Sequence, residues 1–218
     1  MITLANKHTR PAVRQMWKTC FNDTEAFMDL YFAEKYSDGN TLVYMENNRA
    51  VASLQMLPYT FTFHGAHIPV AYVSGACTLP AFRNRGYMGR LLQASVEVMK
   101  QRSIPLSILV PANEHLYQYY ERYGYVRVFE KDDAVIPLRE IWEEAKGDAD
   151  VAYQSFNNLF KDRDFCIQKT KADFLTIVKD AALEGFPPKT NLSGMVRVID
   201  AGYRGILEQQ PTLNLMLE

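Results

Sequence analysis

The strongest structural signal in the chain is Cys77-Thr78-Leu79-Pro80-Ala81-Phe82-Arg83-Asn84-Arg85-Gly86-Tyr87-Met88-Gly89-Arg90-Leu91-Leu92. In this segment an apolar strand ends, a basic turn follows, and an amphipathic helix begins. The first turn of a helix carries unpaired N–H groups and the positive end of the helix dipole, so it favours a bound anion. Arg83 and Arg85 add charge that can pair with phosphates, and Gly86 and Gly89 allow the backbone to approach closely. The segment predicts a pyrophosphate-binding turn, although a plain strand-to-helix turn with solvated arginines has the same local pattern.

The residues before this turn predict two helices followed by an antiparallel meander. Pro11 occupies a favoured first-turn position, and the helix that it opens has one apolar stripe. That stripe comprises Val13, Met16, Trp17, Cys20 and Phe21. Asp23 or Thr24 can cap a second helix, which ends before Asp38-Gly39. Runs rich in Val, Ile, Phe, Tyr and Thr then predict strands over residues 42–45, 51–63 and 68–79.

The residues after the turn alternate between helix and strand. The pattern predicts a helix over 86–102, a strand over 106–110, a helix over 112–123 that ends at Gly124, and a strand over 125–135. A strand–helix–strand order of this kind requires parallel pairing through a right-handed crossover. We therefore predict an α/β fold with a mixed central sheet flanked by helices.

The remainder of the chain predicts a smaller, incomplete α+β extension, so that we expect domains over 1–138 and 139–218. Helices are expected over 138–147 and 150–160, and Thr170 with Asp173 forms a capping box for another helix. Short strands are expected over 195–199, 205–208 and 213–217. Three short strands cannot close a core of their own. The extension must therefore pack on the first domain or on another chain, which leaves a homo-oligomer open.

Composition excludes several classes of protein. The chain has 218 residues with 24 Lys+Arg against 25 Asp+Glu, and it lacks the clustered basic charge that binds nucleic acid or an anionic membrane. No apolar run resembles a signal peptide or a membrane span. Cys20, Cys77 and Cys166 show no CxxC spacing, so we expect reduced thiols in a cytoplasmic protein without a metal. His64 and His67 flank a predicted turn, where solvation is favoured over metal binding.

The basic turn differs from the common nucleotide-binding motifs. The dinucleotide pattern GxGxxG and the Walker A pattern are both absent. Arg83-x-x-Gly86, after a strand and before a helix, instead resembles motif A of the GNAT superfamily of N-acetyltransferases, where Arg/Gln-x-x-Gly-x-Gly/Ala holds the pyrophosphate of acetyl-CoA. Met88 replaces the last small residue and Gly89 follows it, a variant similar to that of the Eis-like branch.

A second motif strengthens this resemblance. Tyr120-Glu121-Arg122-Tyr123-Gly124-Tyr125 is similar to the Tyr-x-x-x-Gly-Phe/Tyr pattern of GNAT motif B, and it lies at the expected distance from motif A. The predicted order of elements before motif A also fits, so that the resemblance covers about residues 1–135. It implies a GNAT-like fold, with acetyl-CoA as the acyl donor.

The resemblance implies a role for each matching position. The strand backbone at Ala76, Cys77 and Thr78 would bind the pantetheine arm and polarise the thioester carbonyl. Asn113 or Glu114 would line the thiol end, and Tyr120 would be the general acid that protonates the leaving thiolate. The pyrophosphate would be held by Arg83 and by the backbone N–H groups of Asn84, Arg85, Gly86, Tyr87, Met88 and Gly89.

Tyr120 and Cys77 each have a simpler explanation. Tyr120 shares a helical stripe with Leu116, Tyr119 and Tyr123, which is typical of a core face. A phenol with a pKa near 10 can nevertheless protonate a thiolate with a pKa of about 8.5, and the motif match favours this role. Cys77 lies in an apolar strand without an adjacent His or Lys, which favours a small buried side chain over an acyl-carrying nucleophile. We therefore expect direct transfer in a ternary complex.

The sequence identifies neither the general base nor the acceptor. Glu25, Asp38, Glu46 and Glu114 flank the predicted cleft, but each is more typical of a surface charge. The expected acceptor is a primary amine of a small molecule or a peptide. The alternative is a non-catalytic acyl-CoA-binding module, because no base is identified and the tail is shorter than that of Eis-like proteins.

Overall fold

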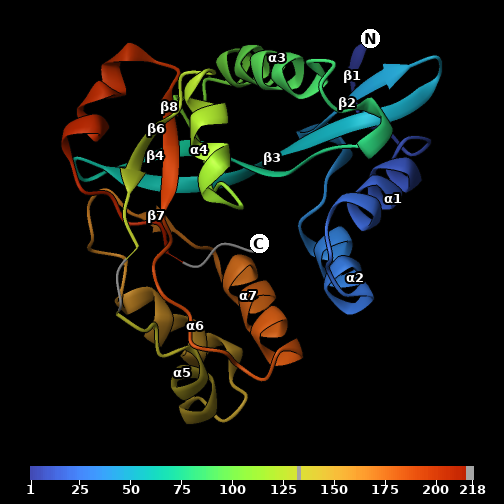
Figure 1. Cartoon of the computed structure of the whole chain (residues 1–218). Coiled ribbons are helices and arrows are strands. Elements are labelled where there is room, and N and C mark those ends of the chain that lie inside the picture. Colours follow the sequence, from blue (N-terminus) through green and yellow to red (C-terminus); the bar gives the residue numbers. More distant parts are fainter. Residues whose placement is uncertain (132–133, 215–218) are drawn as a thin grey trace.

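A mixed β-sheet forms the centre of the computed structural model, which describes residues 1–131 and 134–214 (Figure 1). The strands lie in the order β1-β2-β3-β4-β5-β8-β6, and β7 pairs with β3. Only β4 and β5 pair in parallel; the other pairings between these strands are antiparallel. The strands are β1 (Ile2–Leu4), β2 (Thr41–Glu46), β3 (Arg49–Phe63), β4 (Ala66–Thr78), β5 (Leu106–Leu109), β6 (Val126–Phe129), β7 (Ile167–Gln168) and β8 (Gly194–Val198).

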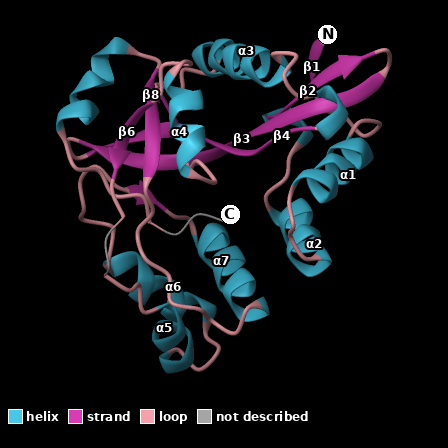
Figure 2. Ribbon diagram, in the orientation of Figure 1, coloured by secondary structure: helices cyan, strands magenta, loops and turns pink. Residues whose placement is uncertain are grey.

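Helices cover both faces of the sheet (Figure 2). The α-helices are α1 (Arg10–Cys20), α2 (Glu25–Glu34), α3 (Tyr87–Gln101), α4 (Glu114–Glu121), α5 (Leu138–Glu144), α6 (Ala149–Asn158) and α7 (Lys171–Leu183). Short 3₁₀ helices are η1 (Asp38–Asn40), η2 (Pro80–Phe82) and η3 (Ala201–Glu208). Helices α3 and α4 lie on one face, and the remaining α-helices lie on the other. None of the helices within the described ranges combines the length and the apolarity needed to cross a lipid bilayer.

The two faces of the sheet bury separate apolar clusters. Side chains of β3 alternate between them, because successive residues of a strand point to opposite faces. Leu54 and Met56 pack in the cluster beneath α3 and α4, whereas Tyr59 and Phe61 pack in the cluster beneath the other helices. This alternation is the period-2 pattern on which the sequence prediction of a meander depended, and it confirms the predicted mixed α/β fold.

The C-terminal segment contributes to the same sheet. Strand β8 lies between β5 and β6, with Val198 opposite Leu106 and Val196 opposite Val126. Strand β7 adds Ile167 to β3 opposite Phe61. The last part of the chain therefore completes the sheet that the first part begins.

One element of the tail differs from the sequence prediction. The predicted strand over 205–208 is wrong, since these residues belong to η3. The Asp200 side chain accepts a hydrogen bond from the Gly202 N–H at 2.9 Å and so favours a helical turn over an extended start. The other predicted strand, over 213–217, extends beyond the described residues.

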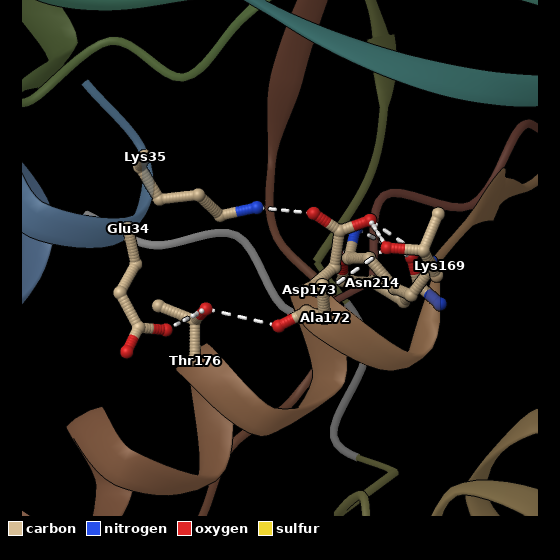
Figure 3. A network of polar contacts seen from close by, with 8 residues as sticks. Glu34, Lys35, Lys169, Ala172, Asp173, Thr176 and Asn214 are labelled. Carbon is tan, nitrogen blue, oxygen red and sulfur yellow. Dashed lines mark hydrogen bonds and ion pairs between the residues drawn. The ribbon is translucent and has the colours of Figure 1, made fainter. Parts of the chain in front are cut away.

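A network of polar contacts joins α2 to α7 (Figure 3). Lys35 forms an ion pair with Asp173, and both side chains are largely buried. The Thr176 hydroxyl donates to Glu34 Oε2 at 2.8 Å, and Lys179 pairs with the same carboxylate. Residues far apart in the sequence are thereby held side by side beneath the sheet.

Lys169, next to the start of α7, is the most buried cation of this region. Its Nζ donates to the Asn214 carbonyl oxygen at 3.1 Å and lies 4.6 Å from the centre of the Tyr59 ring. Burial lowers the pKa of Lys169 to about 7, against the attraction of Asp173 and Cys166, while nearby Lys35 lowers it further. The unfolded chain keeps this proton up to about pH 10.4, so the unfolded state binds more protons between these pH values. Stability contributed by this group therefore rises with pH above 7.

We expect the free energy of unfolding to rise by about 2 kcal/mol between pH 7 and pH 9 through Lys169 alone. Lys169→Met keeps the apolar stem and removes the titration, so its pH dependence should be flatter by that amount. Urea denaturation of both proteins at the two pH values measures the difference. Parallel pH profiles would show that Lys169 does not titrate in a buried state.

Candidate active site

Strands β4 and β5 separate from each other part of the way along β4. Their parallel ladder ends at Tyr72 opposite Ile108, and β5 itself stops at Leu109, whereas β4 continues to Thr78. The edge of β4 beyond Tyr72 therefore has no pairing with β5. Backbone N–H and C=O groups on such an edge need other partners, and a bound molecule can supply them.

A bulge turns β4 at this point. Ser53 pairs with Cys77 and Gln55 pairs with Ser74, so two residues of β4 lie opposite one residue of β3. Gly75 makes the bulge with a φ of +57°, and an added Cβ would lie 2.4 Å from the Trp17 ring. A glycine is needed here both for the backbone angle and for the approach of α1.

A cavity of about 590 Å³ lies along the open edge of β4. Its walls come from the end of α1, the end of β4, the turn before α3, and α4. The lining residues are Cys20, Phe21, Ala76, Cys77, Thr78, Phe82, Arg83, Asn84, Gly86, Tyr87, Met88, Leu116, Tyr119, Tyr120, Arg122 and Tyr123. Segments far apart in the sequence thus meet where the two strands diverge.

The turn before α3 presents the start of a helix to this cavity. Gly86 adopts the left-handed conformation with a φ of +75°, and no atom lies within 4 Å of the position that a Cβ would take. The N–H groups of the first turn of α3 have no partner within the helix. The Arg83 Nε donates to the Thr78 carbonyl oxygen at 3.2 Å and holds its guanidinium beside the end of β4.

The charge of the cavity is positive. Arg83 and Arg122 are in its lining, and the described residues that form its walls include no aspartate, glutamate or histidine. The start of α3 adds the positive end of its dipole. These features favour an anionic ligand such as a phosphate ester.

Tyr120 places a phenol in the wall formed by α4. Its side chain is 8% exposed, and burial raises the pKa of Tyr120 to about 12. The hydroxyl therefore remains protonated at every physiological pH. In the part of the chain that the structure describes, this hydroxyl takes part in none of the hydrogen bonds, so its proton is available to a ligand in the cavity.

The structure brings most of the predicted site residues together. The cavity is lined by Ala76, Cys77, Thr78, Arg83, Asn84, Gly86, Tyr87, Met88 and Tyr120. Tyr87 is held in place because its ring stacks on Tyr44 at 4.3 Å and its hydroxyl donates to Glu46. The arrangement results from β4 and α3 being joined by the basic turn.

Four predicted residues lie outside the lining of the cavity. The Arg85 guanidinium donates to the Ala81 carbonyl oxygen at 3.2 Å and pairs with Glu46 at 3.5 Å. Gly89 makes room for Tyr123, since an added Cβ would lie 2.1 Å from the Tyr123 hydroxyl oxygen.

The other two predicted residues lie at the start of α4. Asn113 is the N-cap residue of this helix, and its side chain makes no capping hydrogen bond. Glu114 is exposed and pairs with Arg127 at 3.1 Å. Neither residue lines the cavity, although both belong to the helix that carries Tyr120.

Sequence reasoning missed several lining residues. Cys20 is the last residue of α1 and Phe21 is its C-cap residue. The apolar stripe predicted for this helix indicated only a core face and gave no sign that its end would reach β4. Tyr119 lies beside Tyr120 on α4, while Arg122 and Tyr123 follow the end of this helix. The spacing of the tyrosines was equally typical of a core stripe. Arg122, the C-cap residue beside that stripe, was the one signal that this end of α4 meets a polar cavity.

The acidic residues that flank the cleft are engaged in ion pairs on the described part of the chain. Glu25 pairs with Arg14 and Lys18, and Asp38 pairs with Arg10 at 2.9 Å. Glu46 pairs with Arg85, as described above. None of them lines the cavity. Within residues 1–131 and 134–214, no group of three or more His, Cys, Asp or Glu side chains is placed to hold a metal ion.

Comparison with known proteins identifies this architecture. The family model described as an acetyltransferase (GNAT) domain matches residues 2–128. Similar solved structures include a probable N-acyltransferase from Enterococcus faecalis V583 (TM-score 0.64, 13% identity, 88% of this chain and 50% of that one). A GCN5-related N-acetyltransferase from Anabaena variabilis has a TM-score of 0.58 with 15% identity over 98% of this chain and 64% of that one.

A third similar structure is Eis1 from Mycobacterium abscessus, with a TM-score of 0.55 and 11% identity over 91% of this chain and 51% of that one. At such identities the likeness concerns the fold. The chain spans only 50% to 64% of the length of these three proteins. A search of curated proteins finds no match.

Gly86 and Gly65 form a matched pair for testing the turn before α3. Both have a φ of +75° and open space where a Cβ would lie, but Gly65 belongs to the β3–β4 hairpin, away from the cavity. Gly86→Ala and Gly65→Ala should each lower the free energy of unfolding by about 1 kcal/mol, because both place an L side chain in the left-handed region. Urea denaturation of both variants checks this. A much larger loss at Gly86 would mean that the turn has a further structural function.

Proposed function

The chain belongs to the acetyltransferase (GNAT) domain family, and on that premise we propose that it transfers an acetyl group from acetyl-CoA to a primary amine of a small molecule or peptide. The observation that carries the proposal is the convergence of three groups on one cavity. They are the open edge of β4, the start of α3 and the Tyr120 phenol. These are the groups that an acyl thioester with a diphosphate would need.

The donor would lie with its pantetheine arm along β4 and its diphosphate at the start of α3. The backbone of Ala76, Cys77 and Thr78 offers hydrogen bonds to amide groups of the arm, much as a neighbouring strand would. The N–H groups between Asn84 and Gly89 would hold the diphosphate, and Arg83 adds a charged partner. A doubly negative group suits a cavity whose lining has two arginines and no carboxylate.

The acetyl group would pass directly between the two bound substrates, without an acyl-enzyme intermediate. The amine nitrogen attacks the thioester carbonyl carbon, the carbon–sulfur bond breaks, and the Tyr120 hydroxyl gives its proton to the leaving thiolate. Backbone N–H groups on the edge of β4 would stabilise the negative charge on the carbonyl oxygen. Because the lining offers no carboxylate or histidine, the incoming ammonium would lose its first proton to water before attack. The second proton, which the nitrogen loses as the amide forms, would return through water to the Tyr120 phenolate. Such a ternary mechanism gives intersecting lines in double-reciprocal plots.

One observation favours a second function. The lining of the cavity contains an anion-binding turn but no carboxylate or imidazole base, which is also what a non-catalytic acyl-CoA-binding module requires. Both functions give heat on titration with CoA. Release of free CoA thiol from acetyl-CoA in the presence of polyamines, aminoglycosides or amino acids separates them, since only the enzyme releases it.

Tyr120→Phe should lower kcat by about 100-fold or more while the dissociation constant for acetyl-CoA changes little, because only the proton donor is removed. Tyr117→Phe is the matched control, since Tyr117 lies on the same helix with the same 8% exposure but outside the cavity. Steady-state kinetics and calorimetry on both variants make the comparison. Equal losses of turnover and affinity in Tyr120→Phe would identify Tyr120 as structural.

Arg83→Gln should weaken acetyl-CoA binding by about tenfold, the effect of losing one charge-assisted hydrogen bond to a phosphate. The difference from wild type should shrink as salt rises, since screening weakens the same interaction in the wild-type protein. Arg163→Gln, on the far side of the sheet against Phe160, is the control. Unchanged affinity for acetyl-CoA in Arg83→Gln would contradict the proposal that a phosphate binds at the turn before α3.

A further inference from the structure

Two cysteines from different elements line the same cavity, and Cys20 packs against the apolar cluster that contains Cys77. Cys20 is the last residue of α1, and its Sγ lies 3.4 Å from the Thr78 carbonyl oxygen at the end of β4. Cys77, one residue before Thr78, places its Sγ 3.5 Å from the Ser53 hydroxyl. Cys20 is half-buried and reachable from the cavity, whereas Cys77 is 5% exposed.

The surroundings of the two thiols differ in a way that separates their ionisation. A hydrogen bond from the Cys77 thiol, followed by the Arg83 guanidinium, lowers the pKa of Cys20 to about 6, although burial opposes the shift. The adjacent Cys20 thiolate and burial raise the pKa of Cys77 well above its ordinary value. Both shifts favour ionisation of the accessible Cys20 sulfur before that of the buried Cys77 sulfur.

Other groups near Cys20 act against its ionisation. The Thr78 carbonyl oxygen accepts a hydrogen bond from the neutral thiol, and the negative end of the α1 dipole lies at Cys20. Arg83 is the charged side chain that lies against the thiol, and Cys77 is its titrating neighbour. The thiolate thus depends on a hydrogen bond and one guanidinium, both of which substitution can remove.

We propose that Cys20 and Cys77 form a thiol–disulfide exchange site whose substrate is a small organic disulfide. The Cys20 thiolate attacks one sulfur of the disulfide, forming a mixed disulfide and releasing the first thiolate. The Cys77 sulfur, after losing its proton to that thiolate or to water, attacks Cys20 and releases the second thiolate. The two cysteines lose two electrons to the reagent, which leaves as two thiols. This arrangement of an accessible attacking thiol and a buried resolving thiol is what exchange chemistry requires.

The site goes beyond acyl transfer and does not depend on it. Both sulfurs belong to the wall of the cavity, so their bond would draw the end of α1 against β4 and narrow the cavity at Thr78 and Arg83. A ligand in the cavity and a disulfide between the thiols would therefore exclude each other. Cys166 provides an internal reference, because it is fully buried and burial raises its pKa to about 11.

The expected reactivity differs most from that of an ordinary thiol at low pH. At pH 6 a thiol with a pKa of about 6 is half ionised, while one with a pKa of about 8.5 is ionised to less than about 1%. A thiolate of lower pKa is also less nucleophilic, which reduces the advantage by a factor of roughly 15. Cys20 should therefore react about tenfold faster than an ordinary accessible cysteine at pH 6.

The experiment uses bis(2-hydroxyethyl) disulfide, a neutral reagent whose approach the arginines do not steer. The full chain is treated between pH 5 and pH 9, quenched with acid, and analysed by intact mass and peptide mapping. We expect the rate to rise with an inflection near pH 6 and the wild type to become two hydrogens lighter, with one bond joining the peptides of Cys20 and Cys77. Cys166 should stay unmodified.

Substitutions assign each step. Cys77→Ser should stop at the mixed disulfide on Cys20 and move the inflection upward, because it removes both the resolving sulfur and the hydrogen-bonding thiol. Cys20→Ser should abolish the reaction, with thermal unfolding confirming that the variant is folded. Arg83→Gln should also raise the inflection. These shifts concern the thiol itself and need no acyl transfer.

Three results would overturn the proposal. They are an inflection near pH 8.5 in the wild type, modification of Cys166 at the same rate as Cys20, and a stable mixed disulfide in the wild type. A separate experiment tests whether CoA binds in the same cavity as the two thiols. The exchange is measured with saturating S-methyl-CoA, a thioether that contains no free thiol. If exchange proceeds at the expected rate but the thioether does not slow it, the thiol pair stands and donor binding in this cavity fails.

Discussion

The parallel pairing of β4 with β5 is the constraint on which the site depends. It joins only Val70–Tyr72 to Leu106–Ile108, because β5 ends at Leu109 while β4 continues to Thr78. A strand that extends beyond the end of its neighbour leaves backbone N–H and C=O groups without partners in the sheet. Here the excess length is at the end of β4 that leads into α3, so the unpaired edge and the unpaired helix start face one cavity.

The rest of the fold fixes that divergence in place. Strand β8 occupies the other edge of β5, with Val198 opposite Leu106, so that β5 cannot shift to follow β4. On β4 the Gly75 bulge is filled by Trp17, which brings α1 to the same edge. Strand β8, near the end of the described chain, and α1, near its beginning, therefore both shape the cavity. The turn before α3 lies between these two elements in the sequence.

The sequence predicted the parts of this arrangement that local pattern controls. The period-2 runs of β2, β3 and β4, the glycine at position 86 and the amphipathic α3 each carry their signal within a few residues. The place of β8 between β5 and β6, and the approach of Cys20 to Cys77, depend on pairing between distant segments and leave no local trace. Gly89 shows that a local pattern can also mislead. The sequence predicted that this glycine lets the backbone approach a bound anion, whereas in the structure it makes room for the Tyr123 side chain.

Arg83 connects the two kinds of chemistry proposed for the cavity. Its Nε is bound to the Thr78 carbonyl oxygen, and its charge helps to lower the pKa of the Cys20 thiol. A phosphate placed at the start of α3 would use the same guanidinium and neutralise part of its charge, which raises the pKa of the thiol again. Occupation by an anionic donor and ionisation of Cys20 therefore oppose each other through one side chain. Because both anions use the Arg83 guanidinium, the cavity can stabilise a bound diphosphate or a reactive Cys20 thiolate. It stabilises the two together only weakly.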